Sequence, residues 1–167
     1  VQEWTMRRAA GIVIEAGGRP AGWEQAGLGK NRGIGQGTLL FSWSGKEPGL
    51  KAARAGYDVV LCAAQHIYFD MAHTSEPHVV GVMWAAFVSM ADALEWDPVP
   101  VNEPELEQRI IGIQGELWSE TIIKDSDMEA MLAPRILALS EVAWSTPWRK
   151  RKLNEFLGAV GHFQSIF

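Results

Sequence analysis

The sequence predicts an α/β fold with a parallel sheet, and two observations carry this prediction. Residues 58–63 form a near-continuous apolar run, which is typical of a strand buried on both faces beneath helices. Strand-like and helix-like patterns also alternate along the chain, as they do where parallel strands are joined by helices. With 167 residues, 47% of them hydrophobic and 21% charged, the chain can form one core.

The individual elements follow from periodicity and from breaker residues. A short strand that runs into a loop is predicted over residues 19–25, and strands are predicted over residues 38–43, 58–63 and 110–117. Helices are predicted up to the Gly17-Gly18 pair, over residues 48–56 and 78–94, after a cap at Ser126 or Asp127, and over residues 152–167. Pro134 lies inside the fourth helical pattern and is expected to kink or divide it, because proline lacks an N–H.

Side chains capable of chemistry follow each predicted strand. They are Trp23-Glu24, Trp43-Ser44, Tyr68-Phe69-Asp70 and Trp118-Ser119-Glu120. Such side chains at the C-terminal ends of successive parallel strands are the active-site pattern of a (β/α)₈ barrel. A complete barrel needs about 250 residues, so four strands in 167 residues indicate half of one.

Composition and spacing argue against several classes of function. The net charge of −5 and a single dense basic run, residues 149–152, give no support for nucleic-acid binding. Cys62 is the only cysteine, so no internal disulfide forms. No apolar stretch approaches the roughly 18 residues that cross a bilayer, and His66, His73 and His78 do not have the spacing of a metal motif. The chain begins at Val1 inside a helical pattern, so further residues are expected to precede it.

The segment of residues 111–120 points to carbohydrate chemistry. A short apolar strand leads into an aromatic ring and a carboxylate two positions apart, Trp118 and Glu120. If the extended conformation persists, both side chains lie on the same face. A flat apolar surface beside a charged acceptor suits a sugar ring, which has one C–H face and a rim of hydroxyls.

An ordered set of motifs resembles family 20 of the glycoside hydrolases, the β-N-acetylhexosaminidases, chitobiases included. The motifs are Gly22-Trp23-Glu24, Ser42-Trp43-Ser44-Gly45, residues 52–60, Tyr68-Phe69-Asp70, residues 112–120 and residues 134–141. They occur in the family's order and at similar spacing. The resemblance implies that residues 1–167 are part of the family 20 catalytic domain: strands five to eight of a (β/α)₈ TIM barrel plus C-terminal helices.

The resemblance also implies what this chain lacks. In the family, an Asp-Glu pair after the fourth strand supplies the general acid and orients the acetamido group of the substrate, and no His-x-Gly-Gly-Asp-Glu string occurs here. Family members use substrate assistance, so the 2-acetamido oxygen attacks the anomeric carbon and no enzymic carboxylate is the nucleophile. The parent protein is expected to remove terminal β-linked GlcNAc or GalNAc with retention, and this chain alone is expected to be inactive.

The resemblance assigns roles to three polar side chains. Tyr68 would donate its hydroxyl to the acetamido oxygen of the oxazolinium-like intermediate. Asp70 and Glu120 would accept hydrogen bonds from the 4- and 6-hydroxyls of the terminal sugar. From the residues alone, Tyr68 and Asp70 also fit a strand end and a turn cap, and Glu120 also fits a helix cap or an ion pair with Arg135.

The resemblance assigns roles to four tryptophans as well. Trp118 would stack under the sugar ring, and Trp23 and Trp43 would wall the acetamido pocket. Trp84 would line the aglycone side. From the residues alone, Trp43 also fits a core position.

The expected partner is an N-acetylhexosamine-terminated oligosaccharide or glycoconjugate. No metal or organic cofactor, nucleic acid or membrane span is expected, and the chain is expected to self-associate or to pair with the missing N-terminal half. The family resemblance suggests a periplasmic, secreted or lysosomal location. The alternatives are a non-catalytic sugar-binding fragment and another barrel glycosidase with Glu120 or Glu116 as its acid. Glu24 is expected to be structural and to pair with an arginine.

Overall fold

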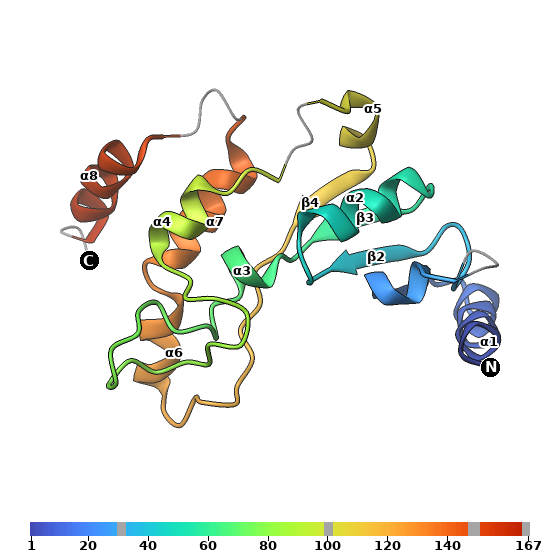
Figure 1. The fold of residues 1–167 in the computed structure, drawn as a ribbon, viewed down its shortest axis with the longest axis horizontal. Coiled ribbons are helices and arrows are strands. Elements are labelled where there is room, and N and C mark those ends of the chain that lie inside the picture. Colours follow the sequence, from blue (N-terminus) through green and yellow to red (C-terminus); the bar gives the residue numbers. More distant parts are fainter. Residues whose placement is uncertain (30–32, 99–101, 147–150, 165–167) are drawn as a thin grey trace. The chain divides into compact units, whose positions relative to one another are not determined.

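The computed structural model describes residues 1–29, 33–98, 102–146 and 151–164 (Figure 1). Its contacts divide the chain into two compact units. The first comprises Val1–Ala63 and Pro98–Gln114, and the second comprises Ala64–Asp97 and Gly115–Phe167. Arg149 and Lys150 of the predicted basic run lie outside the described residues.

The first unit carries a parallel sheet of four strands in its described part, in the order β1-β2-β3-β4. The strands are β1 (Ala21–Trp23), β2 (Leu39–Ser42), β3 (Asp58–Leu61) and β4 (Ile110–Ile113). Leu40, Val59 and Leu61 are fully buried, as expected for strands covered by helices. The predicted α/β class and parallel sheet are confirmed, with shorter strands than the sequence predicts.

The described part of the first unit also contains helices. They are α1 (Gln2–Glu15), the 3₁₀ helix η1 (Glu24–Gly27), α2 (Lys46–Arg54) and α5 (Pro104–Glu107). The α2 helix packs against β2 and β3. At the start of β3, the Asp58 carboxylate accepts from Arg19 at 2.5 Å and from Arg109 at 3.0 Å. These two guanidinium groups hold the pKa of Asp58 below its usual range, and they tie β3 to the residues that precede β1 and β4.

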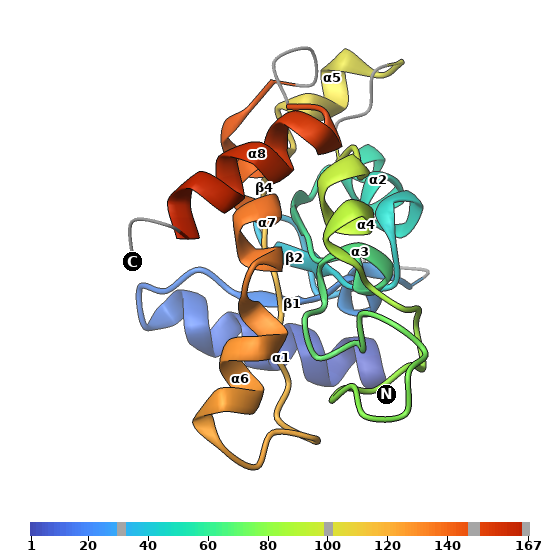
Figure 2. The same cartoon turned by 90° about the vertical axis from the view of Figure 1, so that its left-hand side faces the viewer.

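The second unit is mostly helical. Its helices are α3 (Ala64–Ile67), α4 (Met90–Glu95), α6 (Asp125–Leu132), α7 (Arg135–Trp144) and α8 (Leu153–Gln164). The α4 helix packs against α7 and α8 (Figures 1 and 2). Pro134 separates α6 from α7, as predicted. The α6 helix begins before the predicted cap, and the Asp127 carboxylate accepts from the backbone N–H groups of Ile123 and Lys124.

The predicted helix over residues 78–94 is wrong for most of its length. Only Met90–Glu95 is helical, and Ser89 caps that helix together with Asp92. Upstream, Val82 pairs with the segment after Tyr68: its N–H donates to the Asp70 carbonyl at 2.8 Å and its carbonyl accepts from Ala72 at 2.7 Å. Residues 78–88 therefore have the apolar spacing of a helix but form a loop, because backbone pairing with a distant segment overrides their local helix preference.

No helix in the described part of the chain combines the length and hydropathy that crossing a bilayer requires.

Candidate active site

Two of the predicted tryptophans lie at neighbouring strand ends in the first unit. Trp23 is the last residue of β1, is 39% exposed and meets the ring of Phe41 edge-on at 6.2 Å. Trp43 directly follows β2 and is half-buried, and its indole Nε1 donates to Gln25 Oε1 at 3.2 Å. Because β1 and β2 pair in parallel, Trp23 and Trp43 both lie at the C-terminal end of the sheet.

Glu24 anchors the loop that carries Trp43. Its carboxylate, 3% exposed, accepts from the backbone N–H groups of Trp43 at 3.1 Å and Ser44 at 3.2 Å, and from the Ser44 hydroxyl at 2.5 Å. The structural role is confirmed. Pairing with an arginine stays a prediction, because Arg32 lies outside the described residues. A buried carboxylate that accepts several hydrogen bonds fixes the backbone that donates them.

In the second unit, the segment with Tyr68 and Asp70 is held by backbone pairing on both sides. Phe69 N–H donates to the Glu116 carbonyl at 2.7 Å, and Glu116 N–H donates to the Ile67 carbonyl at 3.0 Å. The Val82 pairing described above holds the other side. Tyr68 and Asp70 are only 4% and 2% exposed, so both belong to a rigid part of the unit.

The Asp70 carboxylate is buried without a full set of partners. Its Oδ1 has no hydrogen-bond partner among the described residues, although the backbone of Asp70 and of Trp118 hydrogen-bonds the carboxylate. Burial raises the pKa of Asp70, and the nearby negative charge of Glu120 adds to this shift, whereas Arg135 opposes it. Within the described residues, the only other buried side-chain oxygen without a partner is Thr121 Oγ1, in the same unit. Unpartnered buried oxygens are rare and often mark functional sites, and of the two only Asp70 Oδ1 belongs to a carboxylate, which is the stronger acceptor for a ligand hydroxyl.

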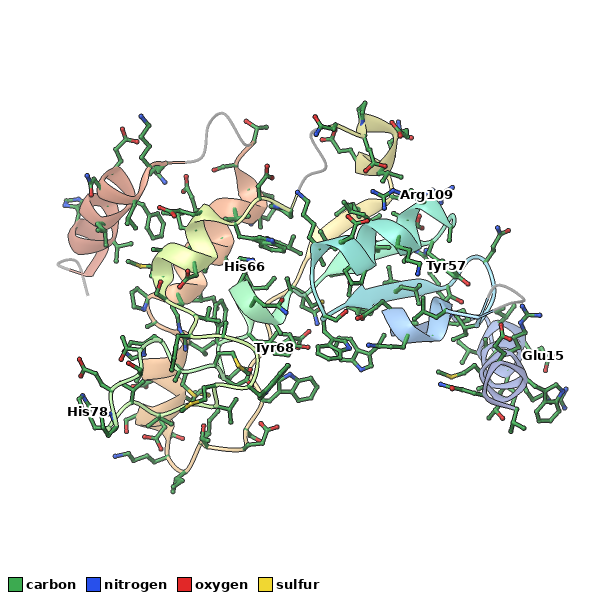
Figure 3. The ribbon with its side chains drawn as sticks, in the orientation of Figure 1. Glu15, Tyr57, His66, Tyr68, His78 and Arg109 are labelled. Carbon is green, nitrogen blue, oxygen red and sulfur yellow. The ribbon has the colours of Figure 1, made fainter. Side chains whose placement is uncertain are left out.

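Two partly exposed tryptophans, Trp84 and Trp118, contact this segment. The rings of Trp84 and Tyr68 (Figure 3) meet edge-on, with their centroids 6.1 Å apart. Trp84 is 57% exposed and Trp118 is 43% exposed. Exposed indole rings offer the flat apolar surface that a sugar ring needs.

Trp118 and Glu120 are not brought to one face by strand alternation. The β4 strand ends at Ile113, and Trp118 and Glu120 lie outside any strand. The two residues instead approach Asp70 separately: Trp118 through its backbone, and Glu120 through its charge.

The contacts of Arg135 are not predicted from the sequence. Its guanidinium group is buried, and every N–H of it donates to a backbone carbonyl. The ion pair with Glu120 that was offered as an alternative is therefore wrong. The one signal in the sequence is a charged residue directly before the apolar run Ile136–Leu139 in α7.

No metal site is found where the structure describes the chain: no group of three or more His, Cys, Asp or Glu side chains is suited to hold an ion. His66 stacks on Trp96, with ring centroids 5.5 Å apart. His66 belongs to α3, whereas His78 lies on a loop of the same unit, as Figure 3 shows.

Comparison with known families decides the class of this protein. Residues 1–147 match the family model described as glycosyl hydrolase family 20, catalytic domain. The chain belongs to this family.

The relatives of this family 20 chain carry matching names. It is 30% identical to the beta-N-acetylhexosaminidase of Cellulomonas fimi in an alignment of 158 residues that covers 91% of this chain and 30% of the relative. It is 34% identical to a beta-hexosaminidase of Vibrio furnissii in an alignment of 143 residues that covers 84% of this chain and 23% of the relative. The chain thus spans less than a third of the length of either relative.

A solved structure supports the fold of this family 20 chain over nearly its whole length. The exo-beta-N-acetylglucosaminidase from Vibrio harveyi, in complex with N-acetylglucosamine, is 35% identical and superposes with a TM-score of 0.88. The match covers 98% of this chain and 26% of that protein.

Proposed function

We propose that this chain is the C-terminal half of a β-N-acetylhexosaminidase barrel, strands five to eight, and that it supplies residues of the sugar pocket. One observation carries the proposal: in a family 20 chain, Asp70 is buried with an unpartnered Oδ1, two positions after Tyr68, and the backbone of the partly exposed Trp118 hydrogen-bonds its carboxylate. The lengths of the relatives and the lack of a His-x-Gly-Gly-Asp-Glu string support the assignment to half a domain.

Tyr68, Asp70 and Glu120 bind the terminal N-acetylhexosamine through hydrogen bonds. Asp70 and Glu120 accept hydrogen bonds from the 4- and 6-hydroxyls, and each bond to a charged group contributes roughly 1.5–3 kcal/mol. Tyr68 donates its hydroxyl to the acetamido oxygen. The backbone pairing of the Tyr68 segment supports this role, because the phenol then needs no rearrangement as charge develops on that oxygen.

The tryptophans provide apolar walls. Trp118 stacks under the sugar ring, and Trp84, which contacts Tyr68, lines the side where the aglycone leaves. Trp23 and Trp43 wall the acetamido group. The anchoring of Trp43 by Gln25, and of its backbone by Glu24, supports a fixed wall.

The reaction is exo-hydrolysis with retention of configuration. The acetamido oxygen of the substrate attacks the anomeric carbon, the leaving-group oxygen takes a proton from a general acid, and water then opens the cyclic intermediate. The general acid and the aspartate that orients the acetamido group are assigned to the half of the domain that is not in this chain.

The test separates sugar binding from turnover. The 167-residue chain is expected to bind GlcNAc but to leave a chromogenic β-GlcNAc substrate intact, because it lacks the acid. Trp118→Ala is expected to weaken binding, measured by calorimetric titration. The control is Trp144→Ala, which removes a tryptophan that is 91% exposed in the same unit.

Other outcomes favour the alternatives. Robust turnover by the chain, abolished by Glu120→Gln, supports a barrel glycosidase with a different acid. GlcNAc binding by the parent protein without any turnover supports a non-catalytic sugar-binding protein. Equal affinity of wild type and Trp118→Ala removes the stacking role.

The two outer strands of the sheet are also part of the proposal. Within the described residues, β1 and β4 each pair with a strand on one side only, and exposed strand edges favour pairing with another chain. We expect the isolated chain to self-associate or to bind its complementary half. Light scattering after size exclusion measures this, and a monodisperse monomer that does not bind the other half contradicts it.

A further inference from the structure

Arg135 uses its whole hydrogen-bonding capacity on backbone carbonyls. Nη1 donates to Met71 at 2.8 Å and to Val88 at 2.9 Å, and Nη2 donates to Phe69 and to Met131 at 2.5 Å. Nε also donates to Met131, at 2.9 Å. A guanidinium group has five N–H donors, so none is left for a carboxylate.

These carbonyls enclose the residue that carries the proposed sugar contact. Phe69 and Met71 are the two neighbours of Asp70 in the chain, and the carbonyl of Asp70 itself accepts from Val82. Loss of Arg135 leaves two carbonyls next to Asp70 without their side-chain donor. Because buried carbonyls without partners are costly, the backbone on both sides of Asp70 would rearrange.

The geometry suits arginine and no other side chain. The guanidinium carbon lies 5.4 Å from the centroid of the Phe69 ring, so the plane that donates to four carbonyls also contacts an aromatic ring. A lysine keeps the charge but has three donors and no planar fork. Burial lowers the pKa of Arg135 to about 10, so the group stays protonated at neutral pH.

We propose that Arg135 is a positioning residue of the sugar site, which fixes Tyr68 and the unpartnered Oδ1 of Asp70 by holding the carbonyls of Phe69 and Met71. This inference rests on the function proposed above. It adds a residue that touches no substrate and acts through the backbone.

Arg135 also acts on Asp70 through its charge. The charged groups that bear on Asp70 are Glu120, after β4, and Arg135, on α7. Glu116 pairs with the Tyr68 segment through its backbone, and the loop of residues 79–88 carries no titratable side chain. A neutral residue at position 135 therefore raises the pKa of Asp70 further, whereas a lysine does not.

The experiment compares Arg135→Lys, Arg135→Met and Asp70→Asn in the 167-residue chain, with GlcNAc as the probe from pH 4 to pH 8. The matched control is Arg151→Met, which removes a surface arginine that pairs with Glu141. We expect Arg135→Lys to weaken GlcNAc binding at least ten-fold at pH 7. The pH at which affinity falls on the acid side should stay the same. Arg135→Met should weaken GlcNAc binding at least as much, and its affinity should begin to fall at a higher pH than in wild type. Arg151→Met should bind GlcNAc as wild type does.

Amide hydrogen exchange gives a second measurement. The N–H groups of Ala72 and Val82 should exchange faster in Arg135→Lys than in Arg151→Met, because both pair with the segment that Arg135 holds. Circular dichroism establishes which variants fold.

The outcomes distinguish this inference from the proposed function. Binding that depends on Asp70 but is unchanged in a folded Arg135 variant overturns the positioning role alone. Failure of both Arg135 variants to fold also overturns it, because the arginine is then a folding determinant only. Absence of GlcNAc binding by wild type, or wild-type affinity in Asp70→Asn, overturns the proposed function and this inference with it.

Discussion

Replacement of Asp70 by asparagine is expected to weaken GlcNAc binding by roughly ten- to a hundred-fold, because a hydrogen bond to a charged group is worth about 1.5–3 kcal/mol. Asp70→Asn should nevertheless leave the melting temperature unchanged or higher. Burial raises the pKa of this carboxyl, so the folded protein disfavours the charged form that the substitution removes. Titration calorimetry and thermal unfolding of the same samples measure the two effects.

The shift of the Asp70 pKa also fixes the sign of the pH dependence. Binding requires the ionised carboxylate, so affinity should fall as the pH drops through a pKa above the usual value of about 3.9. Stability should change in the opposite sense: because the folded-state pKa is raised, the contribution of Asp70 is most favourable below the unfolded-state pKa and declines as the pH rises through the folded-state value.

The control for Asp70→Asn is Asp125→Asn, a change at an exposed aspartate of the same unit. Equal losses of affinity in both variants would exclude a specific role for Asp70.

Gly81→Ala is expected to have the largest effect on stability, about 2–4 kcal/mol, with loss of sugar binding. Gly81 has a φ of +138°, which side-chain-bearing residues rarely adopt. An added Cβ would lie 2.6 Å from Ala72 N and 2.9 Å from the Asp70 carbonyl oxygen. These atoms are backbone and cannot swing aside, so the pairing between Val82 and the Asp70 segment must open. Denaturant unfolding measures the loss of stability.

A glycine in the same unit serves as the control. Gly158 lies in α8, and a Cβ there meets no atom within 4 Å. Gly158→Ala should stabilise the chain by up to about 1 kcal/mol, because alanine is the better helix former. If Gly81→Ala is as stable as Gly158→Ala, the loop of residues 79–88 does not support the site.

The sheet was accessible from the sequence because its signal is local. The apolar run at residues 58–63 and the strand-like segment at residues 38–43 both form strands, since burial on two faces demands apolar side chains at successive positions. The motif resemblance likewise identified the family, and Pro134 marked the boundary between α6 and α7 because proline cannot continue the first helix.

The arrangement around Asp70 was not accessible because its determinants are distant in sequence. Residues 78–88 have helical apolar spacing, yet they pair with Asp70 and Ala72 and include a glycine with positive φ. Nothing in the pattern near Arg135 or Glu24 indicates which backbone groups they bind. A charge buried against carbonyls or N–H groups reveals itself only when the tertiary partners are known.

The hydrogen bonds of Arg135 have a consequence for synthesis on the ribosome. The carbonyls of Phe69 and Met71 precede Arg135 by 66 and 64 residues, so they are translated well before their donor leaves the exit tunnel. Because chains fold as their segments emerge from the ribosome, these two carbonyls remain without their hydrogen-bond donor until α7 has been synthesised. A nascent polypeptide that stalls or is cleaved before Arg135 would carry Tyr68 and Asp70 without the contacts that order them, and would be a preferred target for chaperones and proteases.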